Sequence, residues 1–199
     1  MPTGKIIVIT APSGSGKTTL VKRLLAACPH LGFSISACTR VPREGERHSK
    51  DYYFYDVEQF KKLIAEDAFV EWEMVYSGKY YGTLKSELQR IWDAGKSPLV
   101  DIDVKGALAI RDKYPNSCLT IFIEAPSLDV LRERLRLRGT ETEHSLDERV
   151  SKAATEMTFA PNFDRIIIND DLDVAAKELI GVVEKYLSPA LSEGEGGVT

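Results

Sequence analysis

The sequence predicts an α/β fold in which a parallel β-sheet is flanked by helices. Three observations predict it: short apolar runs recur along the chain, helical stretches separate them, and a glycine-rich loop joins the first run to the first helix. The chain has 199 residues, of which 43% are hydrophobic, so it can build a sizeable core. We therefore expect one domain, which carries smaller inserted lobes.

The apolar runs indicate the strands of the sheet. Residues 5–10 include five consecutive β-branched residues, which is typical of a central strand covered on both faces. Two similar runs, 98–103 and 118–123, and a shorter one at 165–168 predict three more strands. Because helical stretches separate these runs, we expect the strands to be parallel.

The first helix is predicted at residues 18–27, and Pro29 ends it. It directly follows the glycine-rich loop. The helix carries its apolar side chains on one side, namely Leu20, Val21, Leu24 and Leu25. A strand, a glycine-rich loop and a helix therefore form the first unit of the fold.

Two insertions interrupt this pattern. Residues 32–82 hold six of the eight tyrosines and short β-like pieces, which predict a small lobe of strands with one helix near 57–66. Residues 128–155 are highly charged and predict helices. We expect one domain over residues 1–187, with a core at 1–32, 84–127 and 156–187, a lobe at 33–83, a lid at 128–155, and a disordered tail at 188–199.

Composition excludes several classes of function. The formal net charge is −4, whereas proteins that bind duplex nucleic acid usually carry a basic excess. The three cysteines are odd in number and lack metal-binding spacing, so reduced thiols in a cytoplasmic protein are expected. No apolar stretch is long enough for a membrane span or an export signal. The sequence thus predicts a soluble protein without membrane or nucleic-acid partners.

The loop at residues 11–18 reads Ala-Pro-Ser-Gly-Ser-Gly-Lys-Thr and fits the Walker A pattern, except that Ala11 replaces its first glycine. Backbone N–H groups of such a loop converge on phosphate oxygens, which requires Gly14 and Gly16 for unusual dihedral angles and close approach. Lys17 is expected at the β- and γ-phosphates, and Thr18 offers its hydroxyl to Mg²⁺. The alternative is a glycine-rich turn with a chance Gly-Lys-Thr, which the strand–loop–helix context disfavours. The loop predicts a P-loop kinase core that uses ATP and Mg²⁺.

Two aspartates end the apolar run at 98–103. With Asp101 and Asp103 two residues apart on a strand, we expect both carboxylates on one face, at the sheet edge where ligands bind. Asp101 is a candidate Mg²⁺ ligand, and Asp103 a candidate contact to the second substrate. The alternative for each is that it caps the following helix.

Transfer between two phosphates must overcome the repulsion of their negative charges, so cationic side chains are expected. Arg40 and Arg43 flank Pro42 in a turn and suit a terminal phosphate, to which Tyr52 and Tyr81 add hydroxyl donors. No general base is required, because a monophosphate oxygen is already largely ionised at neutral pH. The alternative for the two arginines is a solvated surface turn.

Residues 131–139 carry four arginines in seven residues. On a helix, Arg134 and Arg138 share one face while Arg132 and Arg136 share another, so one pair is expected at the phosphates and the other in solvent. Arg149 follows in a second helix. We interpret this segment as a mobile lid that excludes water from the reacting groups. A solvated basic helix with internal ion pairs is the alternative.

With these motifs in place, the chain resembles guanylate kinase across residues 5–187. The resemblance rests on ordered blocks of sequence, which lie at residues 11–18, 39–46, 50–54, 69–72, 80–83, 101–103, 138–142 and 169–171. It implies a core, a GMP-binding lobe and a helical lid, and Mg²⁺-dependent transfer of the γ-phosphoryl of ATP to GMP in purine nucleotide metabolism. Position 83, often serine in the family, is threonine here and keeps its hydroxyl.

The resemblance also implies a role for each matching residue. ATP is expected at Ser13, Gly14, Ser15, Gly16, Lys17, Thr18, Thr19 and, near adenine, Asn169. The phosphate of GMP is expected at Arg40, Arg43, Tyr52 and Tyr81, and guanine at Ser36, Glu71, Thr83 and Asp103. Asp101 is expected beside the substrates and the metal, and Lys17, Arg40, Arg134, Arg138 and Arg149 around the transferred phosphoryl group.

The choice of guanine also has a physical argument. Its N1–H and N2–H₂ are neighbouring donors, and the carboxylate of Glu71 can accept both, whereas adenine presents a lone pair at that edge. The alternatives are that Glu71 belongs to a plain amphipathic strand, that the chain is an inactive guanylate-kinase-like binding module, or that it phosphorylates a ribose bisphosphate. The sequence does not separate GMP from dGMP, and both a monomer and a homodimer are compatible with it.

Overall fold

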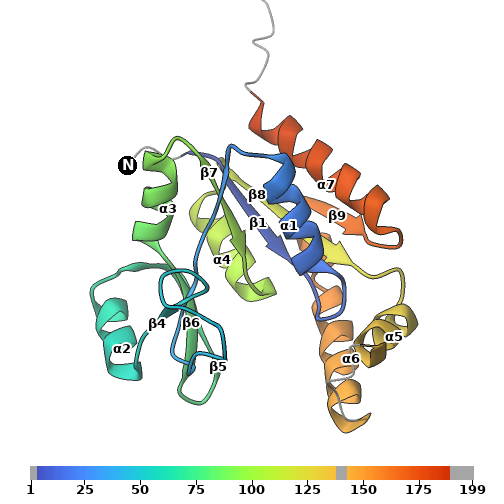
Figure 1. Cartoon of the computed structure of the whole chain (residues 1–199), viewed down its shortest axis with the longest axis horizontal. Coiled ribbons are helices and arrows are strands. Elements are labelled where there is room, and N and C mark those ends of the chain that lie inside the picture. Colours follow the sequence, from blue (N-terminus) through green and yellow to red (C-terminus); the bar gives the residue numbers. More distant parts are fainter. Residues whose placement is uncertain (1–3, 138–142, 189–199) are drawn as a thin grey trace, which may run out of the picture.

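The computed structural model describes residues 4–137 and 143–188 (Figure 1). Its main sheet has the strand order β2-β7-β1-β8-β9, and every neighbouring pair is parallel. The strands are β1 (Ile6–Thr10), β2 (Leu31–Phe33), β7 (Ser97–Asp101), β8 (Cys118–Glu124) and β9 (Arg165–Ile168). The four strands predicted from the apolar runs are all present, and β1 lies at the centre, as its composition predicts.

Helices cover both faces of this sheet because β1 is apolar on both. Ile7 and Ile9 pack with one helical pair, α1 (Lys17–Ala27) and α7 (Leu172–Leu187), which Figure 1 shows side by side. Ile6 and Val8 pack on the other face, under α3 (Lys85–Asp93) and α4 (Val104–Lys113). Because side chains alternate along β1, this one strand contributes to the hydrophobic cores on both faces of the sheet.

A second sheet has the order β4-β3-β6-β5 and is formed by β3 (Ala37–Cys38), β4 (Tyr53–Phe54), β5 (Phe69–Tyr76) and β6 (Lys79–Leu84). Helix α2 (Val57–Ala65) packs on it through Phe60, whose ring stacks on Phe69 at 4.5 Å. Asp56 and Gln59 form a capping box that begins α2. We call residues 37–84 the small-sheet region. The lobe of strands with one helix is confirmed, whereas its exact bounds stay a prediction.

The remaining helices are α5 (Leu128–Leu137) and α6 (Glu143–Met157), followed by the 3₁₀ turn η1 (Ala160–Asn162). Leu131, Leu135 and Leu146 bury their side chains between α5 and α6 in a core of their own. Figure 1 shows this helix pair and the small-sheet region on opposite sides beyond the C-terminal ends of the parallel strands. The charged insertion is thus helical, as predicted. Arg138 and the expected tail at 189–199 lie outside the described residues.

One predicted strand end is wrong. Strand β7 ends at Asp101, and Asp103 is the N-cap of α4, where its carboxylate accepts a hydrogen bond from the backbone N–H of Gly106 at 2.8 Å. Asp103 therefore does not share a strand face with Asp101. The capping alternative describes Asp103 correctly, because a carboxylate at this position satisfies an otherwise unpaired N–H of the helix.

Within residues 4–137 and 143–188, none of the helices combines the length and the apolar composition that a membrane span requires. The cysteines Cys28, Cys38 and Cys118 are buried and form no disulfide.

Candidate functional site

Two adjoining cavities lie at the C-terminal edge of the parallel strands. The first, about 630 Å³, is lined by residues 11–18 and by α6, and we call it the loop cavity. The second, about 520 Å³, is lined by β5, β6 and the end of β7, and we call it the lobe cavity. Four residues line both cavities, namely Lys17, Thr18, Asp103 and Lys152. The shared wall makes the two cavities neighbouring parts of one site.

The glycine-rich loop has the backbone geometry that its sequence predicts. Gly14 and Gly16 have φ angles of 98° and 88°, which other residues rarely adopt. A side chain on Gly16 would also have no room, because its Cβ would lie 2.2 Å from Nδ2 of Asn169. Gly16 is the N-cap of α1, so the loop leads directly into the N-terminus of an 11-residue helix. This arrangement suits the binding of phosphate anions.

Lys17 and Asp101 form an ion pair beneath the loop. Their side chains are only 22% and 21% exposed. The ammonium group lies at the junction of the two cavities, where it can exchange the carboxylate for phosphate oxygens.

The side-chain oxygens of Thr18 and Asp101, beside the loop, are of the kind that coordinates Mg²⁺. Thr18 and Asp101 line the same lobe cavity. Among the described residues there is no group of three or more His, Cys, Asp or Glu side chains placed to hold a metal. A Mg²⁺ ion that takes most of its ligands from phosphates and water needs only one or two protein oxygens, which Thr18 and Asp101 supply.

Glu71 is the acidic side chain expected at guanine, and it lines the lobe cavity together with Ser36 and Asp103. Thr83 lies directly opposite Glu71 in the β5–β6 pair, and its buried hydroxyl donates a hydrogen bond to Oε1 of Glu71 at 2.6 Å. On the other side, a Cβ on Gly106 would lie 2.9 Å from Oε2 of Glu71. Thr83 and Gly106 therefore hold Glu71 in one orientation. Thr83 itself does not line the cavity.

The pKa of Glu71 is raised to about 7, mainly by burial. The hydrogen bond from Thr83 opposes this rise, and the negative charge of Asp103 adds to it. Burial also raises the pKa of Asp103, and the capping hydrogen bond from Gly106 opposes this rise. At neutral pH Glu71 is thus close to the midpoint of its titration.

Arg40 is held by a neighbour that the sequence analysis did not single out. Its guanidinium donates two hydrogen bonds to the carboxylate of Glu46, at 2.5 and 2.6 Å, and lies 4.7 Å from the centre of the Tyr52 ring. The hydrogen bond with Arg40 lowers the pKa of Glu46 to about 2. Tyr81 contacts Tyr52 edge-on, with ring centroids 6.5 Å apart, and both rings line the lobe cavity.

The structure does not bring Arg43 to the lobe cavity. Its backbone N–H donates to Glu46 at 2.8 Å, and the residue is exposed. The guanidinium of Arg40 is likewise absent from the lining of the lobe cavity. Both arginines belong to the turn that follows β3, and Glu46 acts as their counter-ion in the place that a phosphate dianion suits.

Of the pair of arginines expected at the phosphates, Arg134 lines neither cavity and Arg138 lies outside the described residues, so this contact stays a prediction. Arg132 and Arg136 form ion pairs with Glu143 across the two helices. Arg134 instead points to the end of β9, where it donates to the backbone carbonyls of Asn169 and Asp170 at 2.8 and 3.3 Å. Arg149 donates to Oγ of Ser13 at 3.1 Å and lines the loop cavity.

Asn169 lies behind the glycine-rich loop. Its side-chain amide donates to the backbone carbonyl of Ser15 at 2.7 Å, and the residue is 4% exposed. Its Oδ1 is buried and has no hydrogen-bond partner among the described residues. Asn169 lines neither cavity, so its expected contact with adenine stays a prediction. Ser15 is also buried, and Thr19 is exposed on α1 outside the loop cavity.

Lys152 and Glu73 are among the charged cavity residues that sequence reasoning missed. Lys152 lines both cavities, and Glu73 lines the lobe cavity while it accepts a hydrogen bond from Lys105 at 2.8 Å. For Lys152 a signal existed, because Arg149, Lys152 and Glu156 have the spacing of one helix face and all three line the loop cavity. For Glu73 the signal was its alternation with Glu71 along one strand.

Comparison with known proteins gives one consistent result. The family model described as guanylate kinase matches residues 3–186. A guanylate kinase of Bacteroides thetaiotaomicron is 44% identical over 94% of this chain and 91% of that protein. A guanylate kinase of Chlorobium chlorochromatii is also 44% identical, over 94% of this chain and 97% of that protein.

A solved structure agrees with these sequence matches. The crystal structure of guanylate kinase from Anaplasma phagocytophilum has a TM-score of 0.75 and 30% identity to this chain. The match covers 94% of this chain and 88% of that one.

Proposed function

The chain belongs to the guanylate kinase family, and on that premise we propose which of its residues carry the family's reaction. The protein is an ATP:GMP phosphotransferase, which moves the γ-phosphoryl group of ATP to GMP and releases ADP and GDP. The observation that carries the assignment of residues is the shared wall of the two cavities, because a phosphoryl group passes directly from one nucleotide to the other. ATP occupies the loop cavity, and GMP occupies the lobe cavity. An inactive binding module and a kinase of a phosphorylated ribose are not favoured.

The loop cavity binds the triphosphate of ATP. The backbone N–H groups of residues 13–19 face the phosphate oxygens, with Gly14 and Gly16 giving the close approach. A contact between Asn169 and adenine would require its buried Oδ1 to become accessible, because Asn169 does not line the loop cavity in this structure. Thr18 and Asp101 would hold Mg²⁺, which would supply neutralisation of the negative charge on the phosphate oxygens. Lys17 moves from Asp101 to the β- and γ-phosphates and stabilises the charge that shifts onto the leaving ADP.

The lobe cavity binds GMP and selects its base. Glu71 accepts hydrogen bonds from N1–H and N2–H₂ of guanine, while Ser36 and Asp103 contact the same base. Arg40 exchanges Glu46 for the phosphate of GMP, together with Arg43, Tyr52 and Tyr81. Glu71 and Tyr81 lie on the neighbouring strands β5 and β6, so one sheet carries a contact to the base and a contact to the phosphate.

Phosphoryl transfer needs cations around the reacting phosphorus atom. An oxygen of the GMP phosphate attacks the γ-phosphorus of ATP, and the bond from that phosphorus to the β–γ bridging oxygen breaks. Arg149 and Arg134 extend from the helical insertion toward the loop and the end of β9, and Arg138 follows on the same helix face in sequence. We propose that closure of this insertion brings the three arginines onto the transferred group and excludes water.

A coupled assay of ADP formation tests the function. Turnover is expected with GMP and Mg²⁺ together, at a much lower rate with AMP or UMP, and only at background level when Mg²⁺ is removed by a chelator. dGMP is measured in parallel to establish whether the ribose 2′-hydroxyl contributes. Strong turnover with AMP or UMP and none with GMP would overturn the assignment of the base.

The raised pKa of Glu71 predicts how GMP binding depends on pH. Guanine requires the ionised carboxylate, so affinity is nearly complete above about pH 8, is halved near pH 7 and falls further at lower pH. We expect the KM for GMP to rise about tenfold between pH 8 and pH 6, because a group with a pKa near 7 is then about nine-tenths protonated.

The control for this prediction is the Glu71→Gln variant, which has no titrating group at that position. The phosphate of GMP itself titrates near pH 6 and affects both proteins equally. The difference between the two pH profiles therefore isolates Glu71. Parallel profiles for the wild-type and variant proteins would contradict the assignment.

A further inference from the structure

Glu87 is a buried carboxylate that the proposed reaction leaves without a role. It lies in the first turn of α3 and is 2% exposed. A carboxylate buried to this degree is costly unless hydrogen bonds and a counter-ion compensate for its lost hydration. Two partners of Glu87, Ile35 and Tyr53, come from segments far away in the sequence, so the carboxylate joins distant parts of the chain.

Both oxygens of Glu87 are engaged. Oε1 accepts hydrogen bonds from the backbone N–H of Ile35 at 3.3 Å and from Nε of Arg90 at 3.1 Å. Oε2 accepts a hydrogen bond from the hydroxyl of Tyr53 at 2.8 Å. Arg90 also reaches the backbone carbonyl of Phe33 at 3.5 Å. One side chain thus ties α3 to β4 and to the segment between β2 and β3.

This position is where the chain passes twice between the two sheets. On the outward pass, Ser34 still belongs to the main sheet, because its N–H donates to Leu99 at 2.9 Å, whereas Ala37 already pairs with β6. On the return pass, β6 ends at Leu84 and α3 begins at Lys85 without a loop. Glu87 therefore fixes the two connections of the small-sheet region relative to each other.

The residues held by Glu87 are direct neighbours of two lobe-cavity residues. Ser36 follows Ile35, and Tyr52 precedes Tyr53; both line the lobe cavity. The N–H of Tyr53 donates to the carbonyl of Ser36 at 2.9 Å, which couples the two segments directly. A shift of the carboxylate would thus move both sides of the cavity.

The two side-chain donors to Glu87 keep their protons at physiological pH. Burial, and then the hydrogen bond to Glu87, raise the pKa of Tyr53 to about 12, so its hydroxyl remains a donor. The hydrogen bond with Glu87 also raises the pKa of Arg90, which stays cationic.

We propose that Glu87 is a positioning residue that holds Ser36 and Tyr52 at the spacing GMP requires, acting through Ile35 and Tyr53. It touches neither nucleotide. The proposal rests on the proposed function, in which Ser36 and Tyr52 contact the acceptor. It predicts that Glu87 matters for GMP and not for ATP, because the loop cavity is built from other elements.

Steady-state kinetics of Glu87→Ala and Glu87→Gln test this role. We expect Glu87→Ala to raise the KM for GMP about tenfold, because misplaced contacts weaken binding steeply, and to leave the KM for ATP within about twofold. Glu87→Gln fills the same volume and still accepts a hydrogen bond from Ile35, so it should restore most of the affinity for GMP. A merely structural role would not separate the two substrates in this way.

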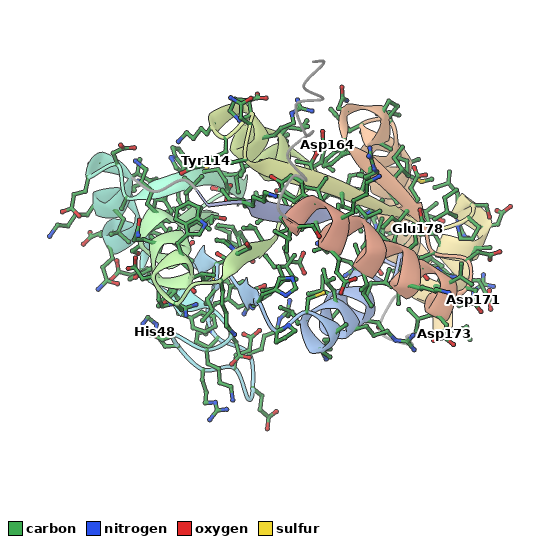
Figure 2. The ribbon with its side chains drawn as sticks, turned by 90° about the horizontal axis from the view of Figure 1, so that it is seen from above. His48, Tyr114, Asp164, Asp171, Asp173 and Glu178 are labelled. Carbon is green, nitrogen blue, oxygen red and sulfur yellow. The ribbon has the colours of Figure 1, made fainter. Side chains whose placement is uncertain are left out.

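Asp164→Asn is the matched control. Asp164 accepts hydrogen bonds from the backbone N–H and the hydroxyl of Thr120, at 2.8 and 2.7 Å, and therefore also ties two segments together. Figure 2 shows it on the side of the molecule opposite His48, which lies in the small-sheet region. This variant should lower the thermal midpoint while the KM for GMP stays unchanged.

The outcomes separate the two proposals. An unchanged KM for GMP in Glu87→Ala, or equal increases for GMP and ATP, would overturn the role of Glu87. If Glu87→Ala does not fold, Tyr53→Phe removes one hydrogen bond only and should raise the KM for GMP about threefold, and no change there would overturn the role as well. Absence of GMP turnover in the wild-type protein would instead refute the proposed function.

Discussion

Replacing Lys17 by alanine is expected to lower kcat by about 10²- to 10³-fold, because one preorganised positive charge is lost where negative charge moves onto the leaving phosphate. In this structure Lys17 already lies at the junction of the two cavities, paired with Asp101. The loss should therefore appear chiefly in the rate of transfer, measured by single-turnover formation of GDP. The KM for GMP should change much less, since Glu71 and the tyrosines of the lobe cavity remain in place.

Lys22→Ala is the control, because it removes an exposed lysine from the same helix. It should keep normal turnover. The thermal midpoint of Lys17→Ala should fall by only a few degrees, about 2–4 °C per kcal/mol for a chain of this size, so that the rate loss is not explained by unfolding. A kcat within about threefold of the wild-type value would remove Lys17 from the proposed mechanism.

Replacing Glu71 by glutamine is expected to lower kcat/KM for GMP by about 10²- to 10³-fold, since two hydrogen bonds to a charged acceptor are lost or inverted. The amide offers one acceptor and one donor where guanine presents two donors. Thr83 donates to Glu71 from below and Gly106 leaves no space beside it, so the glutamine cannot turn away to relieve the mismatch. Affinity for ATP, measured by calorimetry, should remain normal.

The control for the base assignment is Glu66→Gln, which removes one charge from an exposed position at the end of α2. It should leave GMP kinetics unchanged and thereby exclude a general effect of net charge. The rates with AMP provide a second readout, because the glutamine amide can donate to the adenine N1 that repels a carboxylate. Full GMP activity in Glu71→Gln would point to a different acceptor in the lobe cavity.

Much of the site could be predicted because its chemistry is encoded within short stretches of sequence. The φ angles of Gly14 and Gly16, the central place of β1 and the helix at α1 follow from local backbone preferences and apolar patterning. Glu71 and Thr83 were correctly expected in one region, but that they face each other in register emerged only from the pairing of β5 with β6.

The predictions that failed or fell short concern boundaries and partners. Asp103 was predicted at the end of a strand, but it lies at the N-cap of α4, where its carboxylate accepts a hydrogen bond. Arg40 was expected at a phosphate, which stays a prediction, and the structure shows its guanidinium paired with Glu46. In each case the local sequence is compatible with two states, and hydrogen-bond satisfaction in the folded chain selects one.

The amino-acid sequence by itself predicted the phosphate loop from adjacent residues and the parallel α/β core from its apolar runs, because both depend on local backbone preferences and patterning. The class of reaction followed from the resemblance of ordered blocks spread over residues 11–171. Only the tertiary structure shows that the loop cavity and the lobe cavity share a wall. It also places Glu87 between the two sheets, although its partners Ile35 and Tyr53 lie 52 and 34 residues away in the sequence. Burial of a charge is favourable only where distant segments supply its partners, and this supply depends on the path of the whole chain.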